Sequence, residues 1–395
     1  MEPLSFLPAV VALFAAVVTT YFIAWQFGSP PDQGRFASID GLRGYLAFFV
    51  FLHHSSIWYF YLRTGTWHVP PSNLYTHFGQ SSVALFFMIT GFLFFSKLID
   101  GKTKPIDWGN LFVSRFMRLV PLYFFVMFLL FFIVALLSNG SLNEPFPNLI
   151  KGAIHWLGFT ILDAPNLNGI DTNTIVAGVT WSLPYEWFFY FSLPVLALTV
   201  RVVAPLPYMI LGLICIACLF MWLPQTHNLL SFLGGIFSSI LVRADVFREF
   251  SKHNFSGFLA LGFIVTAVMV FPTTYELAPL ILLSLAFSLI AGGNSLFGVL
   301  TNPISRTLGE MAYGIYLLHG IVLFIAFTFL IGRNDAKDFS TIAHWSLVVA
   351  LTPLLILSSF ITFRFIERPA MQRASTVTTW LRLRRRNSKA SDSGH

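Results

Sequence analysis

Residues 38–54 read SIDGLRGYLAFFVFLHH, an apolar run with Arg43 near its start and two histidines, His53 and His54, at its end. Arg43 and His54 are eleven residues apart. On an α-helix such a pair is separated by about 16 Å along the axis, and the two side chains point in similar directions. If this helix crosses a bilayer, the arginine lies at one surface and the histidine near the middle. An ionisable side chain at that depth is costly, so we interpret His54 as a candidate functional residue.

The composition predicts an all-α, polytopic bundle of membrane-spanning helices. Of the 395 residues, 56% are hydrophobic and 10% are charged, whereas soluble domains carry about 25% charged residues. The two cysteines, Cys215 and Cys218, lie in an apolar run, where we interpret them as small helix-packing residues rather than as a redox pair or metal ligands. The sequence carries no phosphate-binding loop and no dinucleotide fingerprint. We therefore expect no metal and no disulfide.

Eleven apolar windows approach the length of about 20 residues that a bilayer requires. They cover residues 4–27, 42–62, 80–97, 111–137, 183–200, 206–223, 229–242, 256–271, 277–291, 311–331 and 343–366. The first window follows the acidic Glu2 and no basic residue, so we expect a retained helix rather than a signal peptide.

Basic residues are distributed unevenly between the two sides of these spans. If the N-terminus is outside, all but four of the 24 lysines and arginines fall on the inner side. The four on the outside are Arg63, Lys151, Arg333 and Lys337. This asymmetry predicts a cytoplasmic C-terminus. The tail, residues 373–395, is rich in arginine, and we expect a disordered segment that contacts anionic membrane lipid rather than nucleic acid.

The longest hydrophilic connection, residues 138–180, falls on the outer side. It contains an apolar piece at residues 150–162 that is too short to span and is followed by several Asp and Asn residues. We expect an interfacial or re-entrant element there. The connection is either a carbohydrate-binding surface or a plain surface loop.

Two groups of basic side chains could carry chemistry. An imidazole can take a proton from a hydroxyl group and return it to a leaving group, so His54 is a candidate general base; the alternative is a buried helix–helix contact. Arg115 and Arg118 lie three residues apart on one face of a helix. Arginine suits phosphate groups, so with Arg43 they could hold a coenzyme A thioester; the alternative is ordinary flanking charge.

Three further polar positions lie in or beside predicted spans. Glu186 is placed at the outer end of a span, where a carboxylate needs a partner. We expect it to orient His54, as the carboxylate of a catalytic triad does, or else to face an outer vestibule. Tyr316 and His319 are three residues apart and form a polar stripe on one helix face. Glu367 ends the last span, and we expect it to pair with a neighbouring arginine.

These positions lie in six short motifs whose order resembles that of the acyltransferase-3 family of integral membrane acyltransferases. The motifs are D-G-L-R-x10-H at residues 40–54, FFMITGFL at 86–93, R-x-x-R at 115–118, W-S-L-x-x-E at 181–186, Y-x-x-Y-L-x-H at 313–319 and F-x-E-x-P at 365–369. Thr90 stands where the family usually has serine, and Trp187 where it often has a second glutamate. The resemblance covers roughly residues 36–372.

The resemblance implies an O-acetyltransferase that uses cytoplasmic acetyl-CoA to acylate a hydroxyl of an extracytoplasmic or lipid-linked glycan. It implies catalytic roles for His54 as base and for Arg43 and Glu186. It implies donor binding by five residues of this chain, which are Arg43, Arg115, Arg118, Tyr316 and His319. A multi-pass protein of a bacterial inner membrane is expected, whose partners are lipid, the glycan acceptor and the acyl-CoA donor.

The sequence also predicts that the chain consists of three parts. We expect residues 1–35 to form a linker and one N-terminal helix that precedes the usual first helix of the family, residues 36–372 the membrane acyltransferase domain, and residues 373–395 the tail. A different function stays open, that of a transporter or flippase for a lipid-linked sugar or a small anion, because eleven spans with scattered polar residues would permit it. The absence of a convincing internal duplication disfavours it.

Overall fold

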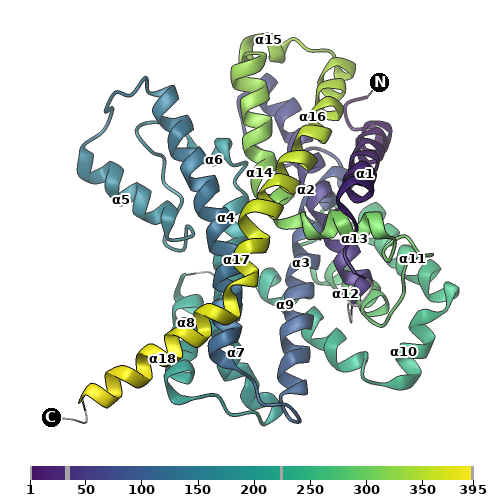
Figure 1. Cartoon of the computed structure of the whole chain (residues 1–395). Helices are drawn as coiled ribbons and strands as arrows, with labels where there is room; N and C mark the ends of the chain where they lie inside the picture. Colours follow the sequence, from purple (N-terminus) through teal and green to yellow (C-terminus); the bar gives the residue numbers. More distant parts are fainter. Residues whose placement is uncertain (1, 32–35, 223–225, 393–395) are drawn as a thin grey trace.

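The computed structural model describes residues 2–31, 36–222 and 226–392, and the regular structure in this part is helical (Figure 1). The longer helices are α1 (Phe6–Phe27), α2 (Ala37–Thr64), α3 (Asn73–Asp100), α4 (Trp108–Leu137), α7 (Ser182–Leu196), α8 (Leu206–Trp222), α9 (Thr226–Leu241), α11 (Asn254–Val270), α12 (Leu277–Ala291), α14 (Ala312–Ile325), α16 (Thr341–Thr362) and α18 (Ala374–Asp392). Shorter elements connect them, namely α5 (Phe146–Leu157), α6 (Thr172–Ile175), α10 (Asp245–Lys252), α13 (Pro303–Glu310), α15 (Arg333–Lys337) and α17 (Arg368–Gln372).

A helix covers each of the eleven windows predicted from the sequence, within the described residues. Six helical segments are long and apolar enough to cross a membrane. Helices α9 and α10 form one further pair, bent by 103°, and three shorter apolar helices lie in α8, α11 and α12. The chain is therefore an all-α, multi-pass membrane protein, and the number of eleven spans stays a prediction.

Helix α2 is packed on several sides. It contacts α3, α13 and α14, while α3 packs along α9, and α16 contacts α1 and α14. A helix that is apolar all round belongs in an interior, and residues such as Phe51 and Trp58 are fully buried. The stretch that carries Arg43 and His54 thus lies inside the bundle.

Glycines allow α13 to cross closely over the start of α2. A Cβ atom at Gly309 would lie 1.8 Å from the carbonyl oxygen of Asp40, and one at Gly44 would lie 2.7 Å from the Gly309 nitrogen. Only small residues permit backbones to approach this closely. The crossing fixes the position of Arg43, which lies between Asp40 and Gly44 on α2.

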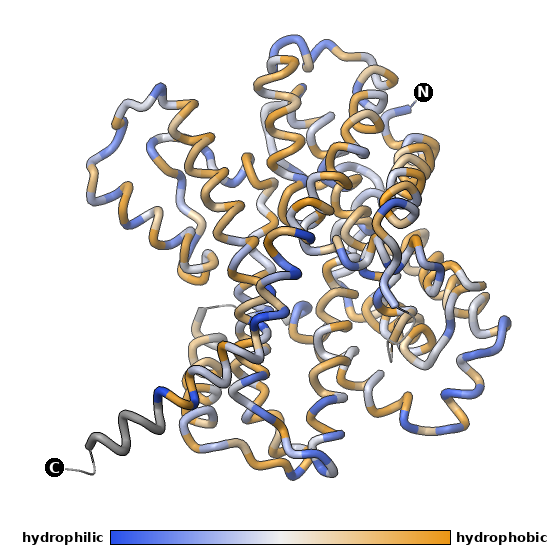
Figure 2. Tube along the Cα trace, viewed as in Figure 1, coloured by the Kyte–Doolittle hydropathy of each residue, from blue (hydrophilic) through white to orange (hydrophobic). Residues whose placement is uncertain are grey.

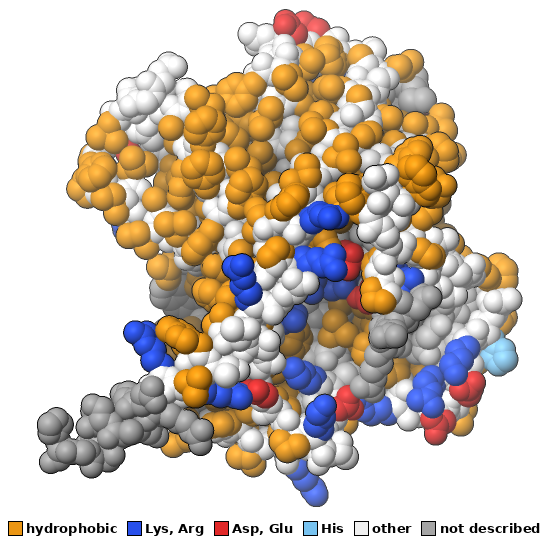
Figure 3. Space-filling model, viewed as in Figure 1, with side chains coloured by type: hydrophobic (Ala, Val, Ile, Leu, Met, Phe, Trp, Pro, Cys, Tyr) orange, Lys and Arg blue, Asp and Glu red, His pale blue; other side chains and the backbone are white. Residues whose placement is uncertain are grey.

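The outer surface is apolar, as a lipid-facing surface must be. Helix α1 exposes Phe14 and helix α4 exposes Phe128, each by more than 60%. Hydrophobic residues follow most of the helices in Figure 2. In Figure 3 the lysines and arginines lie in the middle and lower part of the visible face, and the upper part is largely hydrophobic. On this face the basic side chains are thus concentrated away from the upper part, in line with the charge asymmetry in the sequence.

The connection between α4 and α7 contains both a peripheral and an inserted part. Helix α5 has 12 residues and exposes Phe146 and Ile154, which suits an interfacial helix. The chain then returns to the bundle, where a Cβ atom at Gly320 of α14 would lie 2.4 Å from the carbonyl carbon of Val176. The residues just before α7 therefore pack between the spans.

The tail, which the sequence led us to expect as disordered, is helical from Ala374 to Asp392. It packs against α4, where the Thr378 hydroxyl lies 3.3 Å from Oδ1 of Asn110, and Arg382 forms an ion pair with Asp107. These contacts with a neighbouring helix offset the entropy cost of ordering the segment, which composition alone does not reveal.

Candidate active site

A cavity of about 110 Å³ lies between α2, α3, α4, α7 and α14, and we call it the inner cavity. Its polar lining comes from nine residues, which are Arg43, Thr90, Arg115, Arg118, Ser182, Glu186, Tyr190, Tyr313 and Tyr316. Apolar side chains, among them Phe86 and Leu93, form the rest of the wall. The structure thus brings five of the predicted site residues into one cavity, from four helices that are far apart in the sequence.

Three arginines dominate the charge of the inner cavity. The Arg43 Nη2 atom lies 2.5 Å from Oδ1 of Asp40, whereas its Nε atom is buried without a hydrogen-bond partner among the described residues. The Arg115 guanidinium lies over the ring of Phe94, at 5.2 Å from its centre. Three guanidinium groups around one space repel one another and attract an anion, and their planar donors match the oxygens of phosphate groups.

Glu186 belongs to this arginine cluster. It lines the inner cavity with Arg115 and Arg118, and it accepts a short hydrogen bond from the Tyr190 hydroxyl. The expected contact with His54 is not found among the described hydrogen bonds, so the triad interpretation of Glu186 is wrong. The sequence could have revealed Tyr190 as a partner because it lies four residues further along the same helix.

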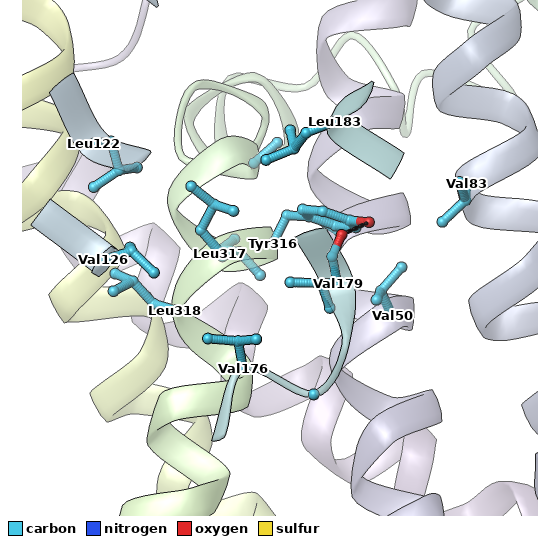
Figure 4. Close-up of a cluster of buried hydrophobic side chains, with 14 of the residues drawn as sticks. Val50, Val83, Leu122, Val126, Val176, Val179, Leu183, Tyr316, Leu317 and Leu318 are labelled. Carbon is cyan, nitrogen blue, oxygen red and sulfur yellow. Dashed lines mark hydrogen bonds between the residues drawn. The ribbon is translucent and has the colours of Figure 1, made fainter. Parts of the chain in front are cut away.

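On the side of the inner cavity toward His319, the lining includes a pair of hydroxyl groups, from Ser182 and Tyr316. The Tyr316 hydroxyl lies 2.8 Å from Oγ of Ser182 and donates to the carbonyl oxygen of Val179 at 3.0 Å. Figure 4 shows the Tyr316 ring with its hydroxyl directed among Val179, Val50 and Val83. The inserted segment before α7 therefore supplies the acceptor that holds the Tyr316 hydroxyl in the wall of the cavity.

His54 does not line the inner cavity and lies beside His319. Its Nδ1 atom is 3.1 Å from Nε2 of His319 and 3.0 Å from the carbonyl oxygen of Val50. The Nδ1 atom of His319 is 3.0 Å from the carbonyl oxygen of Ile315, which can only accept a hydrogen bond. In the neutral ring of His319 the proton is therefore on Nδ1, and Nε2 is an acceptor. His54 Nδ1 then faces two acceptors and must carry a proton itself. This assignment leaves Nε2 of His54 with a free lone pair, the form that a general base needs.

His53 has a different environment. Its Nδ1 atom lies 2.7 Å from the carbonyl oxygen of Tyr75, and a Cβ atom at Gly79 would lie 2.5 Å from its ring. It is 7% exposed and packs tightly against α3, whereas His54 is partly exposed and approaches the ring of Trp67 in the loop after α2. The structure therefore gives a physical reason, which the sequence lacked, to choose His54 over His53.

His319 does not line the cavity that holds the other residues expected to bind the donor. It is fully buried against His54, and neither it nor His54 is among the residues that line the inner cavity. Its contact with His54 suits a residue that fixes the orientation and protonation of the base. Trp67 was missed in the sequence because a single tryptophan in a loop carries no pattern that links it to His54.

A second cavity, of about 190 Å³, adjoins the inner cavity at Arg43 and Arg118, which line both. We call it the charged cavity. Its other lining residues are Pro30, Pro31, Ala37, Asp40, Arg306, Glu310, Phe363, Glu367 and Met371. It contains as many acidic as basic side chains, three of each, unlike the inner cavity.

The fold and the cavities together define a class, a polytopic helical membrane protein with an arginine-rich cavity between its helices. The family can also be given. A family model described as an acyltransferase domain, Acyl_transf_3, matches residues 36–364. The chain belongs to this acyltransferase-3 family and is a membrane acyltransferase. Comparison with curated proteins and with solved structures finds no match.

Proposed function

We propose that the chain is a membrane O-acyltransferase that moves an acetyl group from cytoplasmic acetyl-CoA to a hydroxyl group of an extracytoplasmic or lipid-linked glycan. The observation that carries the proposal is that the inner cavity combines three arginines with the Tyr316–Ser182 hydroxyl pair, and that Tyr316 packs near His319, the partner of His54. The arginines face the cytoplasm, as the positive-inside rule requires.

The donor enters from the side of the arginines. Arg43, Arg115 and Arg118 contact its phosphate groups, and the narrow apolar part of the inner cavity accommodates the thioester arm. When no donor is bound, Glu186 and Tyr190 hold the arginines in place, because the carboxylate of Glu186 neutralises part of the repulsion between the arginines. The cavity walls exclude water from the thioester, which limits its hydrolysis.

The transfer step needs one base. Nε2 of His54 removes the proton from the acceptor hydroxyl while the oxygen attacks the thioester carbonyl carbon. The carbon–sulfur bond breaks, and the departing thiolate takes up the proton that His54 has accepted. His319 stabilises the charged imidazole of His54 through its Nε2 atom, at 3.1 Å. For the carbonyl to reach His54, the Tyr316–Ser182 pair must separate.

The proposal is tested with the purified protein in lipid nanodiscs. Radiolabelled acetyl-CoA is added with lipid-linked and polysaccharide fractions of the source cell, and the products are analysed by mass spectrometry. We expect an added acetyl mass on one glycan fraction with wild type and none with His54→Ala. Equal acetylation by both proteins would exclude His54 as the base, and no acetylation by the wild type on any fraction would contradict the acceptor class.

A further inference from the structure

The charged cavity has a composition that phosphate binding does not explain. It is lined by Asp40, Glu310 and Glu367 together with Arg43, Arg118 and Arg306. A pure phosphate site avoids carboxylates, because they repel the anion. The cavity is therefore suited to a ligand that offers both anionic groups and hydrogen-bond donors.

Glu367 is the most unusual residue of this cavity. It is 2% exposed, and its Oε1 atom has no hydrogen-bond partner among the described residues. The arginine partner that the sequence led us to expect for this atom is thus not found there. A buried polar atom without a partner is costly, so it calls for an explanation such as a missing ligand.

The local backbone places Glu367 at the cavity. The turn Phe363–Glu367 at the end of α16 is π-helical, and α17 follows at Arg368. A π-helical turn rotates the following side chains relative to an α-helix and often occurs at functional sites. Phe363, at the other end of the turn, lines the same cavity.

We propose that the charged cavity binds the adenosine end of the acyl donor, with Glu367 accepting a hydrogen bond from the amino group of the purine. This inference rests on the proposed function. The pyrophosphate lies between Arg43 and Arg118, where the two cavities join, and the thioester arm continues into the inner cavity. One elongated donor then accounts for both cavities and for the two arginines that line both.

The segment that precedes the part of the chain matched by the family model also lines the charged cavity. Pro30 and Pro31, between α1 and α2, line the charged cavity, although the match to the family model begins at residue 36. Arg306 donates to the carbonyl oxygen of Pro31 at 3.0 Å and so attaches this wall to α13. The first helix of the chain thereby contributes to donor recognition through its linker.

The test compares two donors, acetyl-CoA and acetyl-4′-phosphopantetheine, which lacks the adenosine end. Kinetic constants are measured for wild type, Glu367→Ala and the isosteric Glu367→Gln, with Glu249→Ala on the exposed face of α10 as a matched control. We expect Glu367→Ala to raise KM for acetyl-CoA about tenfold, as the loss of one charged hydrogen bond implies, and to leave KM for acetyl-4′-phosphopantetheine unchanged. Glu367→Gln, which keeps an acceptor oxygen, should have a smaller effect.

Binding of adenosine 3′,5′-bisphosphate, measured by calorimetry on the same proteins, gives a readout that does not depend on turnover. We expect it to weaken in Glu367→Ala and not in Glu249→Ala. The inference is overturned if both donors respond equally to Glu367→Ala, or if the bisphosphate binds equally to all variants. Failure of the proposed function has a different signature, since the wild type would then not use acetyl-CoA at all.

Discussion

His54 of α2 and His319 of α14 lie 265 positions apart in the sequence, and their ring nitrogens are 3.1 Å apart in the structure. The two rings are inclined by 32°, with their centres 5.0 Å apart. Each ring also contacts a carbonyl oxygen one turn earlier in its own helix, so both orientations are fixed from two directions. The pair therefore couples His54, the proposed base, to the helix that also carries Tyr316.

The first prediction separates the two neighbouring histidines. His54→Ala should lower kcat for acetyl transfer by about 10²- to 10⁴-fold, the range of a general base, with little change in the melting temperature. His53→Ala should lower the melting temperature, because it leaves the Tyr75 carbonyl oxygen without its partner and opens a space against Gly79. Steady-state kinetics and thermal unfolding in the same nanodiscs measure both. A large kcat loss in His53→Ala at normal stability would reverse the assignment.

The second prediction concerns His319. His319→Ala should reduce kcat less than His54→Ala, because it removes an orienting contact and leaves the base itself. The pH profile of kcat should also shift, since His319 no longer accepts from Nδ1 of His54. A variant with wild-type kcat and an unchanged pH profile would show that the contact is only structural.

The third prediction tests whether the Tyr316–Ser182 hydroxyl pair keeps water out of the inner cavity. Tyr316→Phe removes the hydroxyl that bonds Ser182 and the Val179 carbonyl oxygen. We expect a faster release of free CoA from acetyl-CoA without acceptor, because water then reaches the thioester. Tyr123→Phe, which removes a hydroxyl bonded to Trp156 away from the cavity, is the control. Equal release by wild type and Tyr316→Phe would mean that the hydroxyl pair does not exclude water.

The fourth prediction concerns the arginines. Arg118→Ala should raise KM for acetyl-CoA about tenfold or more, since a charged contact with phosphate is lost, and Arg118→Lys should recover only part of it. Arg201→Ala, at an exposed turn after α7, is the matched control. If the two alanine variants have the same KM, the inner cavity does not bind the donor phosphates.

The fifth prediction is about stability. Gly309→Ala places a methyl group 1.8 Å from the Asp40 carbonyl oxygen, so α13 and α2 must separate. We expect a destabilisation of about 1–3 kcal/mol, the usual cost of overpacking. Gly262→Ala in α11 has free space around its Cβ and should be neutral or slightly stabilising. Thermal unfolding of the two variants measures the contrast, and similar melting temperatures would contradict the tight crossing.

The sequence predicted the helices well because length and apolarity are local properties. Every expected window is helical, and Arg43, Arg115 and Arg118 converge as expected. The sequence did not show which side chains contact each other between different helices. Spacing shows which residues share a helix face, but not which other helix that face meets, so it paired Glu186 with His54 in place of Tyr190.

The charged cavity could not be predicted for a related reason. Its walls come from segments around residues 30, 40, 118, 306 and 367, and no local pattern relates them. The π-helical turn that places Glu367 also leaves no clear trace in the sequence, because it changes the direction of a side chain and not its polarity.

The attachment of α18 to the start of α4 links the tail of the chain to the inner cavity. Thr378 contacts Asn110 in the first turn of α4, and Arg382 contacts Asp107, the N-cap residue of the same helix, which also carries Arg118. Removal of α18 would therefore take away two polar contacts from the beginning of the helix that carries Arg115 and Arg118, and any effect on these arginines would reach the inner cavity through α4.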